Sequence, residues 1–281
     1  MNTIIFTVVV LSSLGVLLAV ILYFVAQKFK VFEDPRIDEV VEMLPGANCG
    51  GCGYAGCRAF AEELVKSDDV SALLCPVGGN SVMSRVAGHL GKTASATDAL
   101  IAVVRCAGAC EVRQRTNLFE GARSCAIMAS TYSGDTGCSF GCLGQGDCVV
   151  SCSFDAIHIN PETLLPEIDG EKCTSCGSCV KACPKFIIEM RKKGPKNRRI
   201  YVSCVNREKG GIARKSCGTA CIGCIKCQKV CAFESITIAN NLAYIDDAKC
   251  RLCRKCVTEC PTNAIVELNF PPRKQEVKSE L

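Results

Sequence analysis

The chain has 281 residues, a formal net charge of +5, 25 cysteines and no tryptophan. Its length predicts about two domains, but aromatic residues make up only 6% of it, so ordinary apolar cores should be small. The odd number of cysteines and their short, regular gaps argue against a disulfide scaffold of the secreted type. The modest charge and the absence of a recognition motif indicate no nucleic-acid partner.

The amino-terminal segment is predicted to be a membrane anchor. Residues 4–26 form a run of 23 uncharged residues, which as a helix would span roughly 34 Å and cross a hydrocarbon core of about 30 Å. A cleaved signal peptide would need a basic start and a shorter apolar run. Lys28 and Lys30 follow the run, so the positive-inside rule predicts a single-pass protein of the cell (inner) membrane with a cytoplasmic body.

A glycine-rich cysteine motif follows the anchor. Its four cysteines have the spacing Cys49-x2-Cys52-x4-Cys57-x17-Cys75. Short amphipathic helices are expected at residues 37–44 and 59–66, on either side of its first part. The interleaved glycines allow the backbone to fold tightly and to bring N–H groups to the sulfurs of a [4Fe–4S] cluster. A structural zinc site is the alternative for this motif.

Two later cysteine runs carry the ligand spacing of bacterial ferredoxins, Cys-x2-Cys-x2-Cys-x3-Cys-Pro. The runs are Cys173, Cys176, Cys179 and Cys183, followed by Pro184, and Cys250, Cys253, Cys256 and Cys260, followed by Pro261. In this pattern three cysteines hold one [4Fe–4S] cluster and the fourth holds a second cluster. Each run therefore needs a second set of cysteines to complete its two clusters, and the cysteines that precede it in the sequence supply that set.

We expect two tandem ferredoxin-like modules with crossed cluster pairing. In the second module, Cys221, Cys224 and Cys227 are paired with Cys260, and Cys250, Cys253 and Cys256 with Cys231. In the first module, Cys173, Cys176 and Cys179 are paired with Cys152, and the remaining set is Cys138, Cys142 and Cys148 with Cys183. The gaps in this last set are irregular. Short strands are predicted at 157–159 and 236–238.

Five cysteines remain outside these five sites. Two of them, Cys106 and Cys204, follow the strand-like segments 101–104 and 200–202, and Cys125 and Cys217 lie further along the chain from each. This parallel predicts a sixth cluster held by Cys106, Cys125, Cys204 and Cys217, with Cys110 unused. The alternative is that these thiols are inert and buried as small apolar groups.

The predicted fold class is α+β, built of small cluster-stabilised modules. We expect a transmembrane anchor at 1–30, a four-cysteine [4Fe–4S] domain at 31–95, a connecting strand-loop unit with extra cysteines at 96–133, the first ferredoxin-like module at 134–190, a basic connection with a second strand-loop unit at 191–216, the second module at 217–270, and a disordered tail at 271–281.

The four-cysteine motif, the anchor and the ferredoxin runs together resemble the B subunit of the Rnf (Rsx) electron transport complex, in its long form with two ferredoxin modules. The resemblance covers essentially the whole chain. It implies an iron–sulfur subunit of a translocase that moves electrons between reduced ferredoxin and NAD while transporting Na⁺ or H⁺. It also implies partners among the other subunits of such a complex, and soluble ferredoxin as the electron donor.

The sequence shows no dinucleotide-binding fingerprint and no Walker A motif, so NAD, flavin and ion chemistry should reside in other subunits. A basic patch formed by Arg191, Lys192, Lys193, Lys196, Arg198 and Arg199 could steer an acidic donor to the chain, lie against an anionic membrane, or be a solvated linker. The rival functions are a polyferredoxin subunit of another membrane reductase or hydrogenase, and a redox-sensing iron–sulfur protein. A series of clusters favours electron transfer over sensing.

Overall fold

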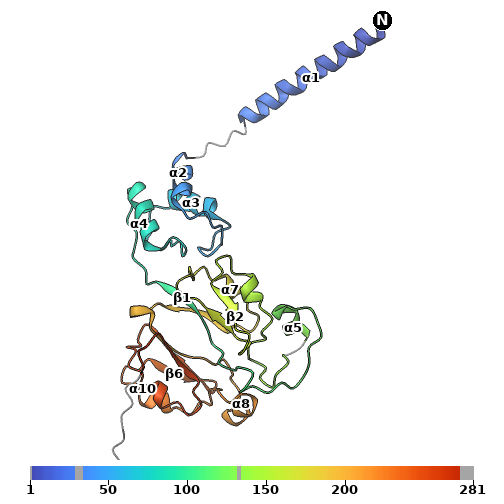
Figure 1. The fold of residues 1–281 in the computed structure, drawn as a ribbon. Helices are drawn as coiled ribbons and strands as arrows, with labels where there is room; N and C mark the ends of the chain where they lie inside the picture. The colour runs from blue at the N-terminus through green and yellow to red at the C-terminus, as the bar shows by residue number, and fades with distance from the viewer. Residues whose placement is uncertain (1, 29–33, 132–133, 273–281) are drawn as a thin grey trace, which may run out of the picture.

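The computed structural model describes residues 2–28, 34–131 and 134–272, and the predicted tail from residue 273 onward lies outside the described residues. The chain runs from a long isolated helix through a small helical domain into a larger body made of two modules (Figure 1). The order of the elements along the chain matches the order of these parts in space. The mixture of short helices and strands in small modules confirms the predicted α+β class.

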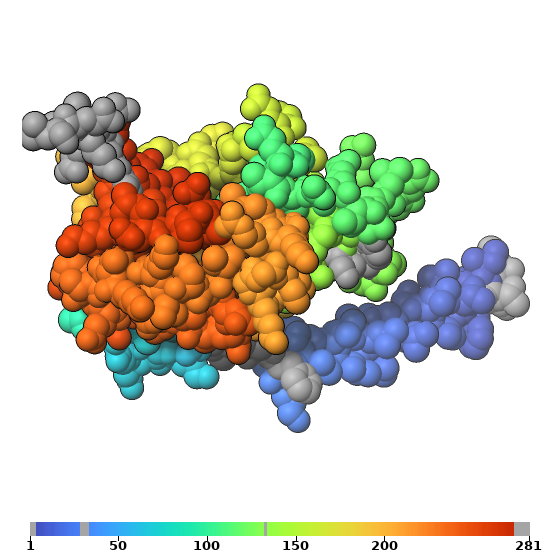
Figure 2. Space-filling model, turned by 90° about the horizontal axis from the view of Figure 1, so that it is seen from below, coloured from blue at the N-terminus to red at the C-terminus, as the bar shows by residue number. Residues whose placement is uncertain are grey.

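The first helix, α1 (Asn2–Lys28), projects away from the body in both views (Figures 1 and 2). Its segment Ile4–Lys28 is the one helix in the described part of the chain that is long and apolar enough to cross a membrane, and it is not buried against the protein. Its apolar side chains face all directions, which is typical of a helix that lipid surrounds. The structure therefore places a helix with the length and composition of a membrane span where the sequence predicts the anchor.

Three helices form the four-cysteine domain: α2 (Arg36–Met43), α3 (Cys57–Lys66) and α4 (Gly79–His89). The helices predicted near 37–44 and 59–66 are confirmed as α2 and α3. Their apolar faces meet in a core that contains Val40, Phe60, Leu64, Met83 and Val86, all at most 1% exposed. Because this core is small, polar contacts at its edge help to fix the helices.

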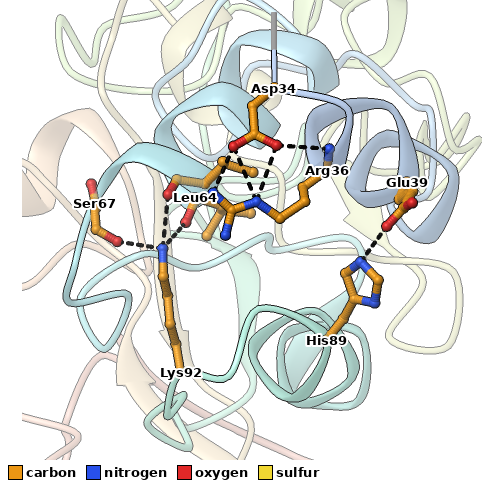
Figure 3. A network of polar contacts seen from close by, with 8 residues as sticks. Asp34, Arg36, Glu39, Leu64, Ser67, His89 and Lys92 are labelled. Carbon is orange, nitrogen blue, oxygen red and sulfur yellow. Dashed lines mark hydrogen bonds and ion pairs between the residues drawn. The ribbon is translucent and has the colours of Figure 1, made fainter.

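Two such contacts are drawn in Figure 3. The Lys92 ammonium group donates hydrogen bonds to the carbonyl oxygens of Leu64, Val65 and Ser67, at 2.7, 3.0 and 2.6 Å. These carbonyls close the carboxyl-terminal end of α3, where helix carbonyls lack intrahelical partners. The other contact joins α4 to α2, through His89 Nε2 and the Glu39 carboxylate at 2.7 Å.

The first ferredoxin-like module has two antiparallel strand pairs. The strands are β1 (Leu100–Val104), β2 (Ile157–Ile159), β3 (Pro166–Ile168) and β4 (Ile188–Lys192), and the helices are α5 (Cys125–Thr131), α6 (Asp147–Val150) and α7 (Ser178–Ala182). β1 pairs with β4, with Val104 opposite Ile188, and β2 pairs with β3. The predicted strand at 157–159 is confirmed. The strand placed in a connecting unit, β1, completes the sheet of this module.

The second module repeats this plan. Its elements are η1 (Pro195–Asn197), β5 (Arg199–Val202), α8 (Gly210–Ser216), α9 (Lys226–Lys229), β6 (Ile236–Ala239), β7 (Leu242–Ile245), α10 (Lys255–Thr258) and β8 (Ile265–Leu268). β5 pairs with β8, with Val202 opposite Ile265, and β6 pairs with β7. Here too the strand that precedes the cysteine runs, β5, is part of the module.

Two buried arginines fasten the modules to each other. Arg105, 8% exposed, follows β1 and donates from Nε to the Val202 carbonyl and from Nη2 to the Cys204 carbonyl, both at 3.2 Å. Arg191, 2% exposed, lies in β4 and donates from Nη1 to the Ile245 carbonyl at 2.6 Å. Both guanidinium groups also contact the Glu189 carboxylate. A charge network of this kind holds the two modules in one orientation.

The Lys92 contact generates the first prediction. Lys92→Met keeps the aliphatic stem but removes three charge-assisted hydrogen bonds, and should lower the local stability of the α3 end by about 2 kcal/mol. We expect faster amide hydrogen exchange at Ser67, whose N–H bonds to the Glu63 carbonyl. Lys66→Met, at an exposed position of the same helix end, is the matched control. Equal exchange in the two variants would contradict the assigned capping role.

Candidate iron–sulfur sites

All 25 cysteines are free thiols, and most are buried or half-buried. Several of their sulfurs accept hydrogen bonds from backbone N–H groups: Gly78 N–H reaches Cys75 at 3.3 Å, Ala156 N–H reaches Cys152 at 3.5 Å and Ala243 N–H reaches Cys221 at 3.5 Å. In the described residues no three His, Cys, Asp or Glu side chains converge on a point that one metal ion could occupy. Backbone N–H groups that point at cysteine sulfurs are typical of iron–sulfur sites, where they tune the potential of the cluster.

Three cysteine loops share one backbone conformation. The residues just before and just after the middle cysteine have positive φ in each loop: Ser175 and Gly177 around Cys176, Gly223 and Ile225 around Cys224, and Leu252 and Arg254 around Cys253. A non-glycine residue in this region costs of order 1–3 kcal/mol unless its surroundings hold it there. The repeated turn carries the three cysteines of each loop around a common centre, as ferredoxin-type ligation requires.

A fourth loop has the same backbone but lacks the middle cysteine. In the segment from Cys142 to Cys148, Gly144 and Gly146 have positive φ and flank Gln145. The gaps are those of a Cys-x2-Cys-x2-Cys run in which glutamine occupies the central position. The Gln145 amide instead bonds to the Leu143 carbonyl at 3.4 Å. The loop therefore offers two thiols of its own where the other three loops offer three.

Helix α5 brings Cys125 to this incomplete loop. The Asp147 carboxylate accepts hydrogen bonds from the N–H groups of Cys125 and Ala126, at 2.8 and 2.9 Å, and from the Ser124 hydroxyl at 3.0 Å. Burial raises the pKa of Asp147, but these hydrogen bonds outweigh it and lower the pKa overall. One cavity is lined by four cysteines, namely Cys125, Cys142, Cys148 and Cys183.

Cys138 lies in a different cavity, between the two modules. That cavity is lined by Cys106, Cys138, Cys204 and Cys217. Asn206 supports it, with its backbone N–H 3.4 Å from the Cys204 sulfur and its side-chain amide 3.7 Å from the Cys138 sulfur. The Thr219 hydroxyl lies 3.3 Å from the Cys217 sulfur.

Two cysteines, Cys125 and Cys138, thus lie in each other's predicted groups. The spacing along the chain groups Cys138 with Cys142, Cys148 and Cys183, which it closely precedes, and assigns Cys125 to the extra site. The structure places Cys125 with the incomplete loop and Cys138 in the extra site. The even spacing of Gln145 between two cysteines, with glycines on both sides, is the sequence signal that reveals this arrangement.

The other groups predicted from sequence also lie together. A further cavity is lined by Cys152, Cys173, Cys176 and Cys179. The second module contains one group of Cys221, Cys224, Cys227 and Cys260 and another of Cys231, Cys250, Cys253 and Cys256. Burial raises the pKa of Cys227 to about 11 and that of Cys256 to about 12, and the neighbouring thiols add to both increases. A bound metal centre would favour the thiolate form of these buried cysteines, because its positive charge offsets the cost of burial.

The four-cysteine domain shows a similar effect at its last cysteine. Burial raises the pKa of Cys75, and the charges of Cys57 and Cys52 raise it further. The Asn48 side-chain oxygen accepts a hydrogen bond from the Cys57 N–H at 2.8 Å, which draws the start of the loop, and with it the adjacent Cys49, toward Cys57. Cys110 is exposed and lines none of the cysteine cavities described here.

The cysteine groups lie next to one another in a series. A Cβ atom at Gly51 would lie 2.8 Å from the Cys176 carbonyl oxygen, so the loop of the four-cysteine domain rests on the first module. Within the body, the charges of cysteines in successive groups interact in the pairs Cys179 with Cys148, Cys142 with Cys106, Cys204 with Cys221, and Cys256 with Cys227. The extra site is the link between the two modules in this series.

Family comparisons match the cysteine-bearing segments. A putative Fe–S cluster domain matches residues 44–77, a 4Fe–4S dicluster domain matches 137–187, and a 4Fe–4S binding domain matches 242–265. The matched segments contain the four cysteines of the first domain, those from Cys138 to Cys183, and the run that begins at Cys250. They support [4Fe–4S] clusters as the cofactors of the chain.

Whole-chain relatives extend this comparison. The B subunit of the Na⁺-translocating ferredoxin:NAD⁺ oxidoreductase complex of Acetobacterium woodii is 44% identical over 94% of this chain and 78% of its own length. The B subunit of the proton-translocating ferredoxin:NAD⁺ oxidoreductase complex of Clostridium ljungdahlii is 39% identical over 94% of this chain and 93% of its own. The B subunit of the ion-translocating oxidoreductase complex of Methanosarcina acetivorans is 36% identical over 92% of this chain and 96% of its own.

Paired substitutions should distinguish the two groupings of cysteines. If Cys125 and Cys148 hold one cluster, Cys125→Ala, Cys148→Ala and the double variant should each lose about four iron and four sulfide per chain. The double variant of Cys138→Ala with Cys148→Ala should lose about eight of each, because two clusters are affected. Anaerobic iron and acid-labile sulfide analysis measures the losses, with Cys110→Ala as the control that loses none. A loss of about eight iron in the Cys125→Ala, Cys148→Ala variant and of about four in the Cys138→Ala, Cys148→Ala variant would instead support the grouping predicted from sequence.

Proposed function

We propose a route of electron transfer through this chain, which belongs to the family of B subunits of ion-translocating oxidoreductase complexes. The chain is an iron–sulfur electron-transfer subunit of a membrane complex of this kind. Within that role, we infer that it accepts electrons from reduced ferredoxin and relays them to partner subunits of an Rnf-type ferredoxin:NAD oxidoreductase. The coupled transport of Na⁺ or H⁺ and the chemistry of NAD then belong to those partners.

The continuous series of cysteine groups is the observation that carries this proposal. We infer six [4Fe–4S] clusters, one for each group. Their ligands are Cys49, Cys52, Cys57 and Cys75; Cys152, Cys173, Cys176 and Cys179; Cys125, Cys142, Cys148 and Cys183; Cys106, Cys138, Cys204 and Cys217; Cys221, Cys224, Cys227 and Cys260; and Cys231, Cys250, Cys253 and Cys256. A sensor needs one such centre, whereas adjoining centres in series suit a relay.

The protein supplies position and electrostatics to this relay. Bound clusters provide reversible one-electron transfer. The backbone N–H groups at Cys75, Cys152 and Cys221 stabilise negative charge on the sulfurs and so favour the reduced state. Arg113, buried beside the Cys106 group with Nη1 2.6 Å from the Cys142 carbonyl, places a positive charge between two groups.

The direction of the relay follows from the two ends of the series. The four-cysteine domain is the part next to α1, so its cluster is the one best placed to meet membrane subunits (Figure 1). The group of Cys231, Cys250, Cys253 and Cys256 forms the opposite end, and Cys253 is exposed there. We infer that a soluble donor delivers electrons at this exposed end, on the cytoplasmic side that Lys28 and Lys30 predict.

A reduction experiment tests the proposed donor. The full chain, loaded with clusters in a lipid nanodisc without oxygen, should be bleached by reduced ferredoxin supplied in excess over the clusters, and the second-order rate should fall as salt rises. Rapid-mixing absorbance spectroscopy measures the rate, and dithionite defines complete reduction. Full reduction by dithionite with none by ferredoxin would reject ferredoxin as the donor. Iron near 24 atoms per chain would support six clusters, and about 20 would support five.

A further inference from the structure

A cleft of about 270 Å³ lies at the exposed end of the series of cysteine groups. It is bordered by the end of β4, the turn η1, the start of β5 and the loop that leads to Cys250. Cys250 and Leu252 contribute directly to its wall. The space exceeds that of several water molecules, each of which occupies about 30 Å³ in the liquid. A small polyatomic ligand therefore fits beside this cysteine group.

The cleft wall carries five basic side chains and two carboxylates. The basic residues are Arg191, Lys192, Lys193, Arg198 and Arg199, and the acidic residues are Asp98 and Asp247. Asp98 pairs with the Lys192 ammonium group at 2.6 Å, and Asp247 accepts a hydrogen bond from the Lys192 N–H at 2.8 Å. The two carboxylates are thus occupied on one side of the cleft, and the positive charge of the arginines exceeds what they balance.

Three guanidinium groups of this wall hold buried nitrogens without an acceptor in the described residues. These atoms are Arg191 Nη2, Arg198 Nε and Arg199 Nε. Arg191 and Arg199 are 2% and 7% exposed, and burial lowers the pKa of Arg199. Arg191 is paired with the Glu189 carboxylate at 2.6 Å and donates to the Ile245 carbonyl, so its charge is already balanced. In the described residues no ion pair balances Arg198 or Arg199. A buried cation without an acidic partner is costly, and the cost falls when an anion approaches it. The basic patch seen in the sequence is therefore partly an internal surface, and not only a solvated linker.

The turn that carries these arginines has a fixed shape. Pro195 begins it, and Lys196 and Asn197 have positive φ. A Cβ atom at Gly194 would clash with the Arg198 carbonyl oxygen, so the chain passes itself closely at this point. The Asn197 side-chain oxygen accepts a hydrogen bond from Arg199 Nη1 at 2.6 Å, and the Arg198 guanidinium lies 5.5 Å from the Phe270 ring centre. The arginines are thus positioned before any ligand arrives.

We propose that this cleft binds an oxyanion of the phosphate or carboxylate class. Guanidinium groups present planar pairs of N–H donors that match such oxygens, and the lysines at the rim add charge. A free phosphate and a carboxylate side chain of an acidic partner offer the same chemistry, and the cleft accepts either through Arg198 and Arg199. The binding site exists whether or not ferredoxin donates electrons to the chain. Because Cys250 lines the cleft, a bound anion also lowers the reduction potential of the adjacent centre.

Calorimetric titration of the full, cluster-loaded chain in detergent at low salt tests this site. Inorganic phosphate should bind saturably with one site per chain, and Arg198→Gln should weaken it at least tenfold through the loss of charge-assisted hydrogen bonds. Lys196→Gln is the matched control, since Lys196 is an exposed cation of the same turn outside the cleft wall, and should change affinity less than twofold. Arg198→Lys, which keeps the charge, should fall between them.

A second titration distinguishes the sources of the anion. A glutamate-rich peptide that binds more tightly than phosphate, and loses affinity in Arg198→Gln, would assign the cleft to the acidic surface of a partner. Tighter binding of phosphate would assign it to a free oxyanion. Iron, sulfide and visible absorbance equal to those of the unaltered chain verify that each variant is folded. Lack of saturable binding by both anions, or equal losses in Arg198→Gln and Lys196→Gln, would overturn the proposal.

Discussion

The burial of thiol groups is the constraint on which the rest of this structure depends. The strands of the two modules have three to five residues, and the helices next to the regular cysteine loops have four or five. Elements this short enclose only small apolar cores, such as the one formed by Ile200, Ile236 and Ile245 in the second module. Much of the buried centre of each module consists of cysteines whose pKa burial raises, such as Cys148 and Cys256. A cluster bound by these thiolates would offset that cost and so contribute to the stability of the fold.

The same logic explains how the modules are joined. β1 and β5 each complete the sheet of the module that follows, and Cys106 and Cys204 lie just beyond their ends. Arg105 lies between β1 and Cys106 and donates to the Cys204 carbonyl, so one side chain fixes both strand ends. The contact that orients the modules also sets the spacing of the Cys106 group. The residues that hold the two modules together therefore also hold the cysteines of the Cys106 group in place.

Regular features could be predicted from the sequence because local spacing determines them. The Cys250 and Cys173 runs, the helices near Cys57 and the strands at 157–159 and 236–238 all follow from patterns of a few residues. The strands that pair with these two, β3 and β7, were not predicted. The exchange of Cys125 and Cys138 between two cysteine groups is only half visible in the gaps, where Gln145 marks the loop as one thiol short. Which cysteine completes the group depends on α5 folding back onto Asp147. A contact across 22 residues leaves no periodic signal. The burial of Arg191 and Arg199 was hidden for a similar reason, since both belong to strands that a charge pattern alone presents as a linker.

The position of the arginine cleft links anion binding to the redox state of the neighbouring centre. If an anion in the cleft lowers the reduction potential of the centre beside Cys250, reduction of that centre must weaken the binding of the anion by the same factor. A donor that docks through its carboxylates would then be held while the centre is oxidised and released once its electron has arrived. Buried arginines suit this task better than exposed lysines, because charges in a less polar environment interact more strongly and are less screened by salt. The cleft would thus couple docking to electron delivery without any change in the fold.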